Sequence, residues 1–476
     1  MRTLVRTAAF LCVIAAGSAA EGPELRAGAA AVKITPPKGA PLAGYYYNRA
    51  AEGVHDDLYA KALVLEQEGT KVAFVVCDLI SLSRPIVEQA RKLITDSSSV
   101  RGENVMMSAT HSHTGPVLRG GSTRSAAQGG EEDVAVKYAE ELPKLIAESV
   151  ELAAERLTNA VVLAAIGYEE HLSFNRRFFM RDGTVVWNPG KANTNIIRAA
   201  GPIDPDVGVL LLQTPDAKAA IATYVNFAMH PDTVGGLQIS ADYPYTLSRL
   251  LGEYKGADML TIFANGACGN INHVDVKWQD PQKGHHEAVR IGTILAANVL
   301  QAYKKALPVS GSLRTRSETV KLPLPIVSEA EIEEARRIAR IPADAKTPQP
   351  KFLDRVKAYK VLDVMARDGK PHEVEVQVIA LGDEVAWVSL PGEMFVELGL
   401  AIKKASPFRY TFIAELANGS VGYIPNREAY AQGAYEVVSS RCAEGSGELL
   451  VQSGIHQLKR LHAAVIGPTA NRSSRE

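Results

Sequence analysis

The apolar positions of the chain follow two periods, one typical of strands and the other typical of helices. The stretch "LYAKALVLEQEGTKVAFVVCDL" contains two apolar runs joined at Glu68-Gly69, which predicts a β-hairpin. Over residues 131–157 the apolar side chains recur at helical spacing, which predicts a long amphipathic helix. The apolar stripe of this helix consists of Val134, Tyr138, Leu142, Leu145 and Ile146.

Strands and helices alternate through the middle of the chain as well. Apolar strands are predicted at "DVGVLLLQT" and "AAIATYVNFAMH", and helices at "YPYTLSRLLGEY" and "HEAVRIGTILAANVLQAYKKA". Several strand pairs read as hairpins, which favours partly antiparallel sheets over a plain doubly wound sheet. The pattern therefore predicts an α/β fold of the mixed α+β kind, in which layered mixed β-sheets are flanked by helices.

A helical segment interrupts this alternation near residues 328–368. "SEAEIEEARRIARI" opens with Ser328 and Glu331, which have the spacing of a capping box. Phe352 to Met365 continues the helical period, and "HEVEVQVIAL" then returns to strict alternation. We expect one large domain over residues 21–465, with a helical insertion at about 328–368.

The two ends of the chain differ from the rest. The first twenty residues carry two arginines, then an apolar stretch from Ala8 to Gly17, then small residues, a pattern typical of a secretory signal. We expect cleavage before Glu21 and a secreted or periplasmic protein. No later apolar stretch has the roughly twenty residues that a transmembrane helix needs. Residues 466–476 are expected to form a disordered tail.

Charge and cysteine content narrow the classes of function. The chain has 52 Lys and Arg against 53 Asp and Glu, so its balance argues against a nucleic-acid partner. Once the signal is removed, Cys77, Cys268 and Cys442 remain. They are too few for a disulfide framework and too far apart for a cysteine metal site.

Histidines that end two apolar runs are the first candidates for chemistry. "ENVMMSATHSH" ends in His111 and His113, and if the strand runs into them both side chains face the same side. "YVNFAMHPDT" delivers His230 in the same way, and the proline after it ends the strand. The three imidazoles are either metal ligands and acid/base groups or buried polar side chains with hydrogen-bond partners.

Two later segments add acidic and phenolic groups. Glu393 follows Pro391-Gly392 between an apolar strand and a helix, where it either ligates a metal or favours the helix N-terminus. Tyr423, Tyr430 and Tyr435 stand among Gly, Asn and Pro, where tyrosines ordinarily cover the edge of a core. Taken singly, neither segment decides between a functional and a structural role.

Together these stretches resemble the neutral/alkaline non-lysosomal ceramidase family. The motifs that carry the resemblance are "SATHSHTGP", "FNRR", "NFAMHP", "LPGE" and "GYIPNREAYAQGAYE", and it runs from about Val32 to about Gly447. In the last motif Tyr423 and Tyr435 are twelve residues apart. The resemblance implies that residues 21–465 form a ceramidase-like zinc hydrolase domain.

The resemblance also implies a role for each residue of the site. His113 is the implied general acid/base, and Arg176 with Tyr435 is implied to stabilise the oxyanion of an amide under attack. The arginine doublet leaves Arg177 as the alternative to Arg176. Nitrogen and oxygen ligands leave zinc room for a water, whose pKa the metal lowers towards about 7. The implied zinc (Zn2+) ligands are His111, His230, Glu393 and Tyr423.

Two departures from the family pattern bear on the substrate. The Gly-rich loop of ceramidases contains Gly-Asp-Val-Ser-Pro, whose serine has been proposed as nucleophile. The corresponding loop here is "CGNINH", with Asn270 and Asn272 in place of the Asp and the Ser. Asn272 is expected to bind substrate through hydrogen bonds without attacking it. Ceramidases also carry a C-terminal immunoglobulin-like domain, whereas this chain ends about thirty residues beyond Gly447, and both departures argue against ceramide itself.

The sequence therefore predicts an exported zinc-dependent hydrolase that cleaves a linear amide bond by metal-activated water. The expected substrate is a small-molecule or lipid-like amide, with an ester or a glycan-linked compound as the alternative. A second alternative is a secreted, non-catalytic binding protein on the same scaffold. A third is a metal-independent hydrolase, which would need Cys268 of "GACGN" as its nucleophile.

Overall fold

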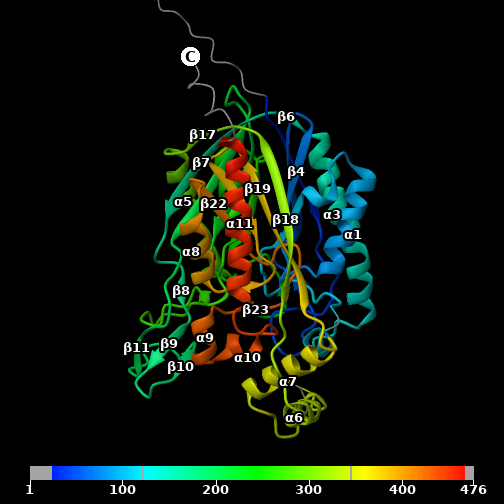
Figure 1. Ribbon diagram of the computed structural model, residues 1–476, viewed down its shortest axis with the longest axis vertical. Helices are drawn as coiled ribbons and strands as arrows, with labels where there is room; N and C mark the ends of the chain where they lie inside the picture. Colours follow the sequence, from blue (N-terminus) through cyan, green and yellow to red (C-terminus); the bar gives the residue numbers. More distant parts are fainter. Residues whose placement is uncertain (1–23, 121, 343–345, 467–476) are drawn as a thin grey trace, which may run out of the picture.

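The computed structural model describes residues 24–120, 122–342 and 346–466. The expected signal segment, residues 1–20, and residues 467–476 of the expected tail lie outside these ranges. Within the described ranges, no helix combines the length and the apolar character needed to cross a membrane. Figure 1 shows three sheets that run roughly along the long axis of the molecule, with helices on their outer faces.

The first sheet pairs its strands in the order β5-β4-β3-β1-β6. Its elements are β1 (Arg26–Lys33), β3 (Tyr59–Gln67), β4 (Thr70–Cys77), β5 (Val105–Ala109) and β6 (Thr158–Asn159). The hairpin predicted at Glu68-Gly69 is confirmed as the antiparallel pair β3–β4. Helices α1 (Arg84–Ser97) and α3 (Asp133–Glu155) bury their apolar stripes against the outer face of this sheet, which confirms the long amphipathic helix predicted over 131–157.

The second and third sheets are built from later parts of the chain in the orders β15-β13-β12-β7-β17 and β18-β19-β20-β22. The second contains β7 (Val161–Tyr168), β12 (Asp206–Gln213), β13 (Ala220–Phe227), β15 (Leu260–Asn265) and β17 (Leu307–Val309). The third contains β18 (Leu313–Leu322), β19 (His372–Leu381), β20 (Val385–Ser389) and β22 (Tyr410–Ala414). Helices α4 (Tyr243–Lys255) and α5 (His285–Tyr303) cover the second sheet, and α8 (Val396–Ala405) and α11 (Ser446–Ile466) cover the third.

The inner faces of the three sheets share one apolar core. Phe74 from the first sheet lies 4.6 Å, between ring centroids, from Trp387 of the third. Tyr224 of the second sheet lies 5.9 Å from Phe412 of the third. All four rings are buried, so the sheets cannot slide past one another without opening this core. The predicted mixed α/β architecture of layered sheets and flanking helices is confirmed.

Each of the three sheets contains the same unit, which the hydrophobic pattern did not predict. Two antiparallel strands are followed by a helix and then by a strand that lies parallel to the second strand. The units are β3-β4-α1-β5, β12-β13-α4-β15 and β19-β20-α8-β22. In each unit, the two parallel strands therefore have their carboxyl ends at the same edge of the sheet, where open sheets collect ligand sites.

Short strands and helices make up the remaining regular structure. A small sheet consists of β9 (Arg177–Met180), β10 (Val185–Trp187) and β11 (Ile196–Ala199). The two-stranded pairs are β2 (Gly53–Val54) with β14 (Gln238–Ile239), β8 (Phe174–Asn175) with β16 (Ile271–Asn272), and β21 (Glu393–Met394) with β23 (Tyr423–Ile424). The short helices are η1 (Gly102–Asn104), α2 (Thr123–Ala127), α9 (Arg427–Gln432) and α10 (Tyr435–Ser439).

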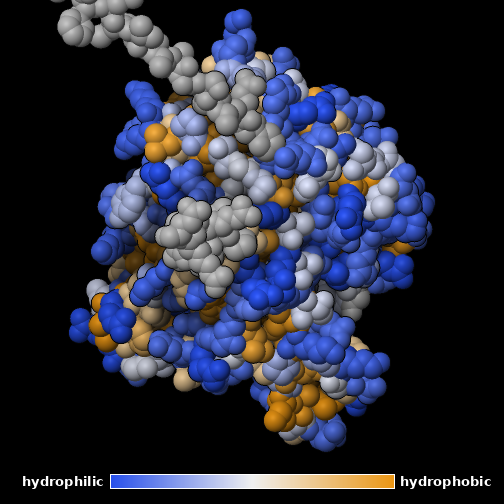
Figure 2. Space-filling model, turned by 45° about the horizontal axis from the view of Figure 1, so that its top comes forward, coloured by the Kyte–Doolittle hydropathy of each residue, from blue (hydrophilic) through white to orange (hydrophobic). Residues whose placement is uncertain are grey.

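The predicted helical segment at 328–368 forms α6 (Glu329–Ala339) and α7 (Phe352–Met365), with the capping box of Ser328 and Glu331 in place. The two helices bury a small apolar cluster of their own. Figure 1 places them at one end of the molecule, and in Figure 2 hydrophobic side chains gather at that end of an otherwise mostly hydrophilic face. α7 also packs on the rest of the molecule, because Val356 and Tyr359 share an apolar cluster with Tyr46, Tyr423 and Tyr435.

One buried carboxylate joins α7 to its surroundings. Asp363 accepts hydrogen bonds from the backbone N–H and the hydroxyl of Thr123, both at 2.7 Å. Its other oxygen accepts bonds from Arg441 at 2.8 and 2.5 Å. Asp363 thus connects α7 to the start of α2 and to the loop after α10.

One expectation about local structure is wrong. The pattern of "ENVMMSATHSH" predicts a strand that continues to His111 and His113, but β5 ends at Ala109. His111 has a φ of 75°, a left-handed conformation that a strand does not contain. The two histidines are therefore brought together by a loop, and not by the alternation of a strand.

Replacing Asp363 by alanine is expected to lower the free energy of unfolding by about 3 kcal/mol, because a partly buried Arg441 loses its carboxylate and Thr123 loses its acceptor. Urea unfolding followed by circular dichroism measures the change. Glu333→Ala, on the exposed face of α6, is the control, with an expected change below about 0.5 kcal/mol. Equal stability of the two variants would contradict the role given to Asp363.

Candidate metal centre and active site

The carboxyl ends of the six parallel strands meet around one point. The segments after β5, β13 and β20 carry the histidines of "SATHSHTGP", His230 and Glu393, respectively. Backbone bonds join these ends: the Thr110 N–H donates to Cys77 at 2.9 Å, and the Glu415 N–H donates to Asn265 at 3.0 Å. The site is therefore assembled by the repeated unit of the fold, from segments almost three hundred residues apart.

Two imidazoles are held by backbone carbonyls in the same way. His111 Nδ1 lies 2.8 Å from the Ile80 oxygen, and His230 Nδ1 lies 2.8 Å from the Cys268 oxygen. A carbonyl can only accept, so each Nδ1 carries a proton, and Nε2 is the lone-pair atom of each ring in its neutral form. This orientation by an outer carbonyl is the arrangement in which histidine ligates metals.

Glu393 faces both of these Nε2 atoms. Its Oε2 lies 3.4 Å from His111 Nε2 and 3.3 Å from His230 Nε2. Burial alone would raise the pKa of Glu393, but the two imidazoles outweigh burial and hold that pKa well below its usual range. Among the described residues, Glu393 Oε2 and His230 Nε2 are buried without a hydrogen-bond partner. Both atoms are thus available to coordinate a cation.

The spacing of these atoms fits zinc. Ligand atoms at about 2.0–2.1 Å from a tetrahedral zinc are about 3.3 Å from one another. The two nitrogen–oxygen separations above have this value, and the donor set of imidazole nitrogens and a carboxylate oxygen is one that zinc accepts. The residues present therefore fit the ion that the sequence implies.

His113 lies beside these three residues. Its Nε2 is 3.2 Å from His111 Nε2, and its Nδ1 is 3.4 Å from an Asp232 oxygen. One ring nitrogen from each of His111, His113 and His230 lies within 4.8 Å of the others, so geometry alone would also accept His113 as a third nitrogen ligand. Burial, followed by the neighbouring imidazoles, lowers the pKa of His113 well below its usual value.

A glycine makes room for the His113 ring. A Cβ on Gly44 would lie 2.8 Å from the Cβ of His113 and 2.9 Å from its Nδ1, and the φ of Gly44 is 99°. Both the close approach and the left-handed backbone exclude other residue types. Gly44 therefore shapes the site directly.

Tyr423 stands next to Glu393 because their short strands pair. Glu393 and Tyr423 are partners in the parallel bridge of β21 and β23. Burial, and then the charge of Glu393, raise the pKa of the Tyr423 phenol, whereas the Arg176 guanidinium opposes them. Arg176 Nη2 donates to the Tyr423 hydroxyl at 3.1 Å. This bond favours a phenolic oxygen that carries negative charge, as a metal ligand would.

The two arginines of "FNRR" have different surroundings. Arg176 reaches Tyr423, whereas Arg177 donates to the Gly433 carbonyl at 2.9 Å and to Gln432 at 3.2 Å. Both guanidinium groups bind the Glu436 carboxylate, at 2.8 and 3.0 Å. Of the pair, Arg176 is the arginine that lies against the candidate metal ligands.

Tyr435 belongs to an aromatic wall of the site. Its ring lies 5.4 Å from Tyr423 and 4.7 Å from Trp187, measured between centroids. Tyr46 and Phe352 pack against it as well, at 6.5 and 5.6 Å. The wall therefore joins the start of α10, the β23 and β10 strands, the first turn of α7 and the segment around Tyr46.

The "CGNINH" loop lies against the "FNRR" strand through the β8–β16 bridge. The Asn272 amide donates to Asn188 at 3.0 Å, and its oxygen accepts from the Val274 N–H at 3.0 Å. Asn270 is similarly bound, to Glu397 and to the Val396 N–H. The Asn272 amide therefore has a neighbour on each side, and a substrate that binds it must share or displace one of them.

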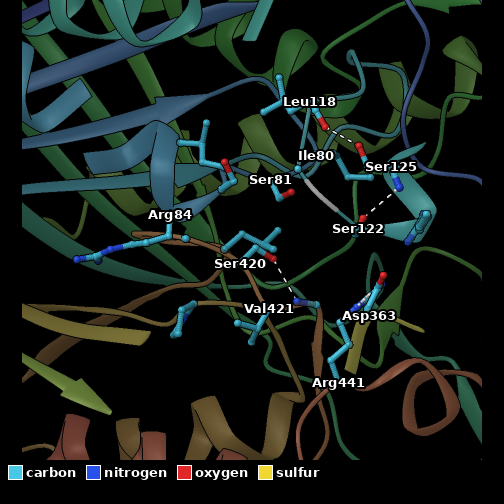
Figure 3. A pocket seen from close by; sticks show the side chains of 18 of the residues that line it. Ile80, Ser81, Arg84, Leu118, Ser122, Ser125, Asp363, Ser420, Val421 and Arg441 are labelled. Carbon is cyan, nitrogen blue, oxygen red and sulfur yellow. Dashed lines mark hydrogen bonds and ion pairs between the residues drawn. The ribbon is translucent and has the colours of Figure 1, made fainter. Parts of the chain in front are cut away.

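A cavity of about 510 Å³ adjoins the centre. His111 and Glu393 line it together with residues from α2, α7 and the loop after β22. Figure 3 shows Ser122 and Ser125 on one wall and Arg441 directed at Asp363 on another. The lining mixes hydroxyls and charged groups with apolar side chains such as Leu118 and Val421, so it differs from a purely apolar pocket.

Some residues of the site carry no signal that the sequence analysis used. Asp232 beside His113 is one, although it stands only two positions after His230. Glu415 is another: its oxygens accept from the Cys268 N–H at 3.0 Å and from the Cys268 thiol at 2.9 Å. Burial raises the pKa of Glu415 to about 8 and raises that of the Cys268 thiol well above its usual value. A protonated, buried Cys268 is not an activated nucleophile.

Comparison with known proteins agrees with the resemblance seen in the sequence. Residues 26–241 match the family model "Neutral/alkaline non-lysosomal ceramidase, N-terminal". A neutral ceramidase from Pseudomonas aeruginosa aligns over 92% of this chain and 75% of its own, with 19% identity and a TM-score of 0.70. A ceramidase complexed with C2 aligns over 92% of this chain and 76% of its own, with 18% identity and a TM-score of 0.68. A search of curated proteins gave no significant match.

Glu436→Gln is expected to lower the free energy of unfolding by about 3 kcal/mol or more, because two buried arginines lose the charge that compensates them. Glu436 is fully buried, as its two partners nearly are. Glu444→Gln is the matched control, since it removes an exposed pair with Arg427 that is expected to contribute less than about 1 kcal/mol. Chemical denaturation compares the two, and a Glu436 variant as stable as the control would contradict this account.

Proposed function

The chain resembles the neutral/alkaline non-lysosomal ceramidases in sequence over residues 26–241 and in fold over most of its length, and we propose that it is a zinc-dependent hydrolase of amide bonds. The proposed ligands are His111, His230, Glu393 and Tyr423. The proposal takes residues 21–465 as one catalytic domain. The signal-like first twenty residues support export to the periplasm or the medium.

One observation carries the proposal. Two buried imidazoles, each fixed through Nδ1 by a carbonyl, direct their Nε2 lone pairs at a buried carboxylate oxygen 3.3–3.4 Å away. An isolated cluster of this kind is costly, because lone pairs and negative charge face one another away from water. A bound cation would remove this cost, and the arrangement therefore supports metal binding.

The metal would act as a Lewis acid that lowers the pKa of a coordinated water towards about 7 and polarises the substrate carbonyl. His113 is proposed to take the proton from the attacking water and to deliver it to the leaving nitrogen as the C–N bond breaks. The products are then a carboxylic acid and an amine. Asp232, 3.4 Å from His113 Nδ1, would hold the ring in the required tautomer.

Charge on the carbonyl oxygen is proposed to be stabilised by Tyr435 and Arg176. The Tyr435 hydroxyl is a neutral donor at neutral pH, because burial raises its pKa well above the usual value. Arg176 is fixed by Glu436 and by the Gly269 carbonyl, at 2.8 and 2.7 Å. Donors that are held in place before reaction stabilise developing charge without reorganisation. Asn272 is proposed as a further contact to the substrate.

Two alternatives belong to the same scaffold. An ester or a glycan-linked amide would be hydrolysed through the same kind of tetrahedral intermediate. The cavity lining combines polar, charged and apolar side chains, which is compatible with either substrate. A non-catalytic binding protein would need neither His113 nor the Arg176–Tyr423 contact. Zinc present in the purified protein, with no turnover on a broad amide and ester panel, would favour the binding protein.

His230→Ala is expected to lose the metal. Purified wild type should carry about one zinc per chain, and the variant far less after dialysis, because one nitrogen ligand and its orientation through Cys268 disappear. Metal analysis by mass spectrometry measures the ratio. His286→Ala, an exposed histidine at the start of α5, should keep the wild-type content. Unchanged zinc in the His230 variant would overturn the proposed ligand set.

His113→Gln is expected to keep the zinc and to lower kcat by about 10²–10⁴-fold, the contribution of a positioned acid/base group. Amide hydrolysis and zinc content are measured on the same preparation, with His171→Gln as a control at an exposed position. Loss of the zinc together with activity would instead make His113 a ligand. Unchanged kcat would remove it from the proton transfer.

A further inference from the structure

Arg124 is a cation of the cavity that has no carboxylate partner. It lines the same cavity as His111 and Glu393, and among the described residues no ion pair is formed by its guanidinium. Nη2 donates to the Gly44 backbone carbonyl at 2.8 Å, and Nε donates to the Tyr45 backbone carbonyl at 3.3 Å. These bonds fix the group through two of its nitrogens, and in the described part of the chain no carboxylate lies within ion-pair distance of it.

The ring of Tyr46 lies below this guanidinium, 4.4 Å from its central carbon. The charge of Arg124 also interacts with Tyr435 and with Glu393. Arg124 is therefore held between the aromatic wall and the candidate metal centre. An arginine never loses its proton in this pH range, so the cavity has a permanent positive charge at this position.

Other charged groups of the cavity are already compensated. Arg441 binds Asp363 at 2.5 Å, and Arg84 binds Glu88 at 2.7 Å and also Glu375. Burial lowers the pKa of His372 to about 4, so this histidine is neutral at pH 7. Glu373 pairs with Lys321 at 3.1 Å.

Arg367 resembles Arg124 in this respect. It donates to two backbone carbonyls, those of Lys370 and Pro371, at 2.9 and 2.6 Å. No carboxylate in the described part of the chain forms an ion pair with it. Arg124 and Arg367 thus line the cavity without a carboxylate at ion-pair distance in the described residues, and Arg124 is the one that interacts with Glu393 of the proposed site.

We propose that the substrate carries an anionic oxygen group, such as a carboxylate, sulfonate or phosphate, which binds Arg124 while the amide lies at the metal centre. This inference rests on the proposed hydrolase function and narrows its substrate class. A guanidinium pairs well with such oxyanions because its N–H groups match their geometry. A neutral lipid amide offers nothing to compensate a fixed cation, and its burial there would cost desolvation of the charge.

Two matched substrates test the proposal. N-hexanoyltaurine and N-hexanoylethanolamine share the acyl chain and the amide, and differ in a sulfonate against a hydroxyl. A sulfonate is a weak metal ligand, so a preference for it does not report on zinc. With zinc-loaded wild type, kcat/KM for the sulfonate compound is expected to exceed that for the neutral compound by about tenfold or more. Equal values would overturn the proposal.

Arg124→Gln is expected to abolish that ratio, and Arg124→Lys to retain part of it, because lysine keeps the charge but loses the fork of donors. Arg119→Gln is the control on the same segment, since Arg119 is exposed, pairs with Glu131 and is not among the residues that line the cavity. It should keep the wild-type ratio. A ratio that survives in Arg124→Gln would assign the preference to another group and contradict the proposal.

A second measurement does not depend on the variants or on turnover. Calorimetry with zinc-loaded wild type should detect binding of 1-hexanesulfonate about tenfold or more tighter than that of 1-hexanol. If the sulfonate binds but no amide is hydrolysed, the hydrolase function fails and the anion site stands. If amides are hydrolysed and the sulfonate binds no better than the alcohol, the anion site fails and the hydrolase function stands.

Discussion

A buried carboxylate that faces two imidazole lone pairs is the constraint around which this molecule is organised. Glu393, His111 and His230 follow strands of three different sheets, and a buried carboxylate that faces two neutral imidazoles is costly without a cation. Each imidazole is fixed from outside by a carbonyl. The rest of the fold holds the two imidazole Nε2 atoms 3.4 and 3.3 Å from the Glu393 carboxylate.

The repeated strand-strand-helix-strand unit explains how three sheets can satisfy this constraint. Each unit ends two parallel strands at the same edge, and the shared core of Phe74, Tyr224, Trp387 and Phe412 brings the three edges together. Buried groups join the units where they meet. The Glu415 carboxyl, for example, accepts hydrogen bonds from the backbone N–H groups of Cys268 and Met394. Glu415 therefore connects the segment that orients His230 to the segment that carries Glu393.

The electrostatics outside the metal centre separate structural cations from functional ones. Arg177 and Arg441 are bound to buried carboxylates and stabilise the fold, and Arg176 shares Glu436 while it reaches Tyr423. Arg124 differs because its partners are neutral carbonyls and an aromatic ring. The proposed anionic substrate follows from this difference, since a neutral amide would offer the guanidinium no counter-charge.

The sequence by itself determined the periodic elements and the chemistry-bearing residues, because helical and strand periods and short motifs are local properties of the chain. It predicted the β3–β4 hairpin, α3, the α6–α7 segment and a resemblance that named the ligand candidates. It did not predict that one strand-strand-helix-strand unit occurs three times, since the three units share a topology and not a residue pattern. Tertiary structure alone decided that Arg176 rather than Arg177 touches Tyr423 and that a loop, with His111 in a left-handed conformation, joins the histidines. It also decided that Arg124 has no carboxylate at ion-pair distance among the described residues, because ion pairing depends on which distant side chains the sheets bring together.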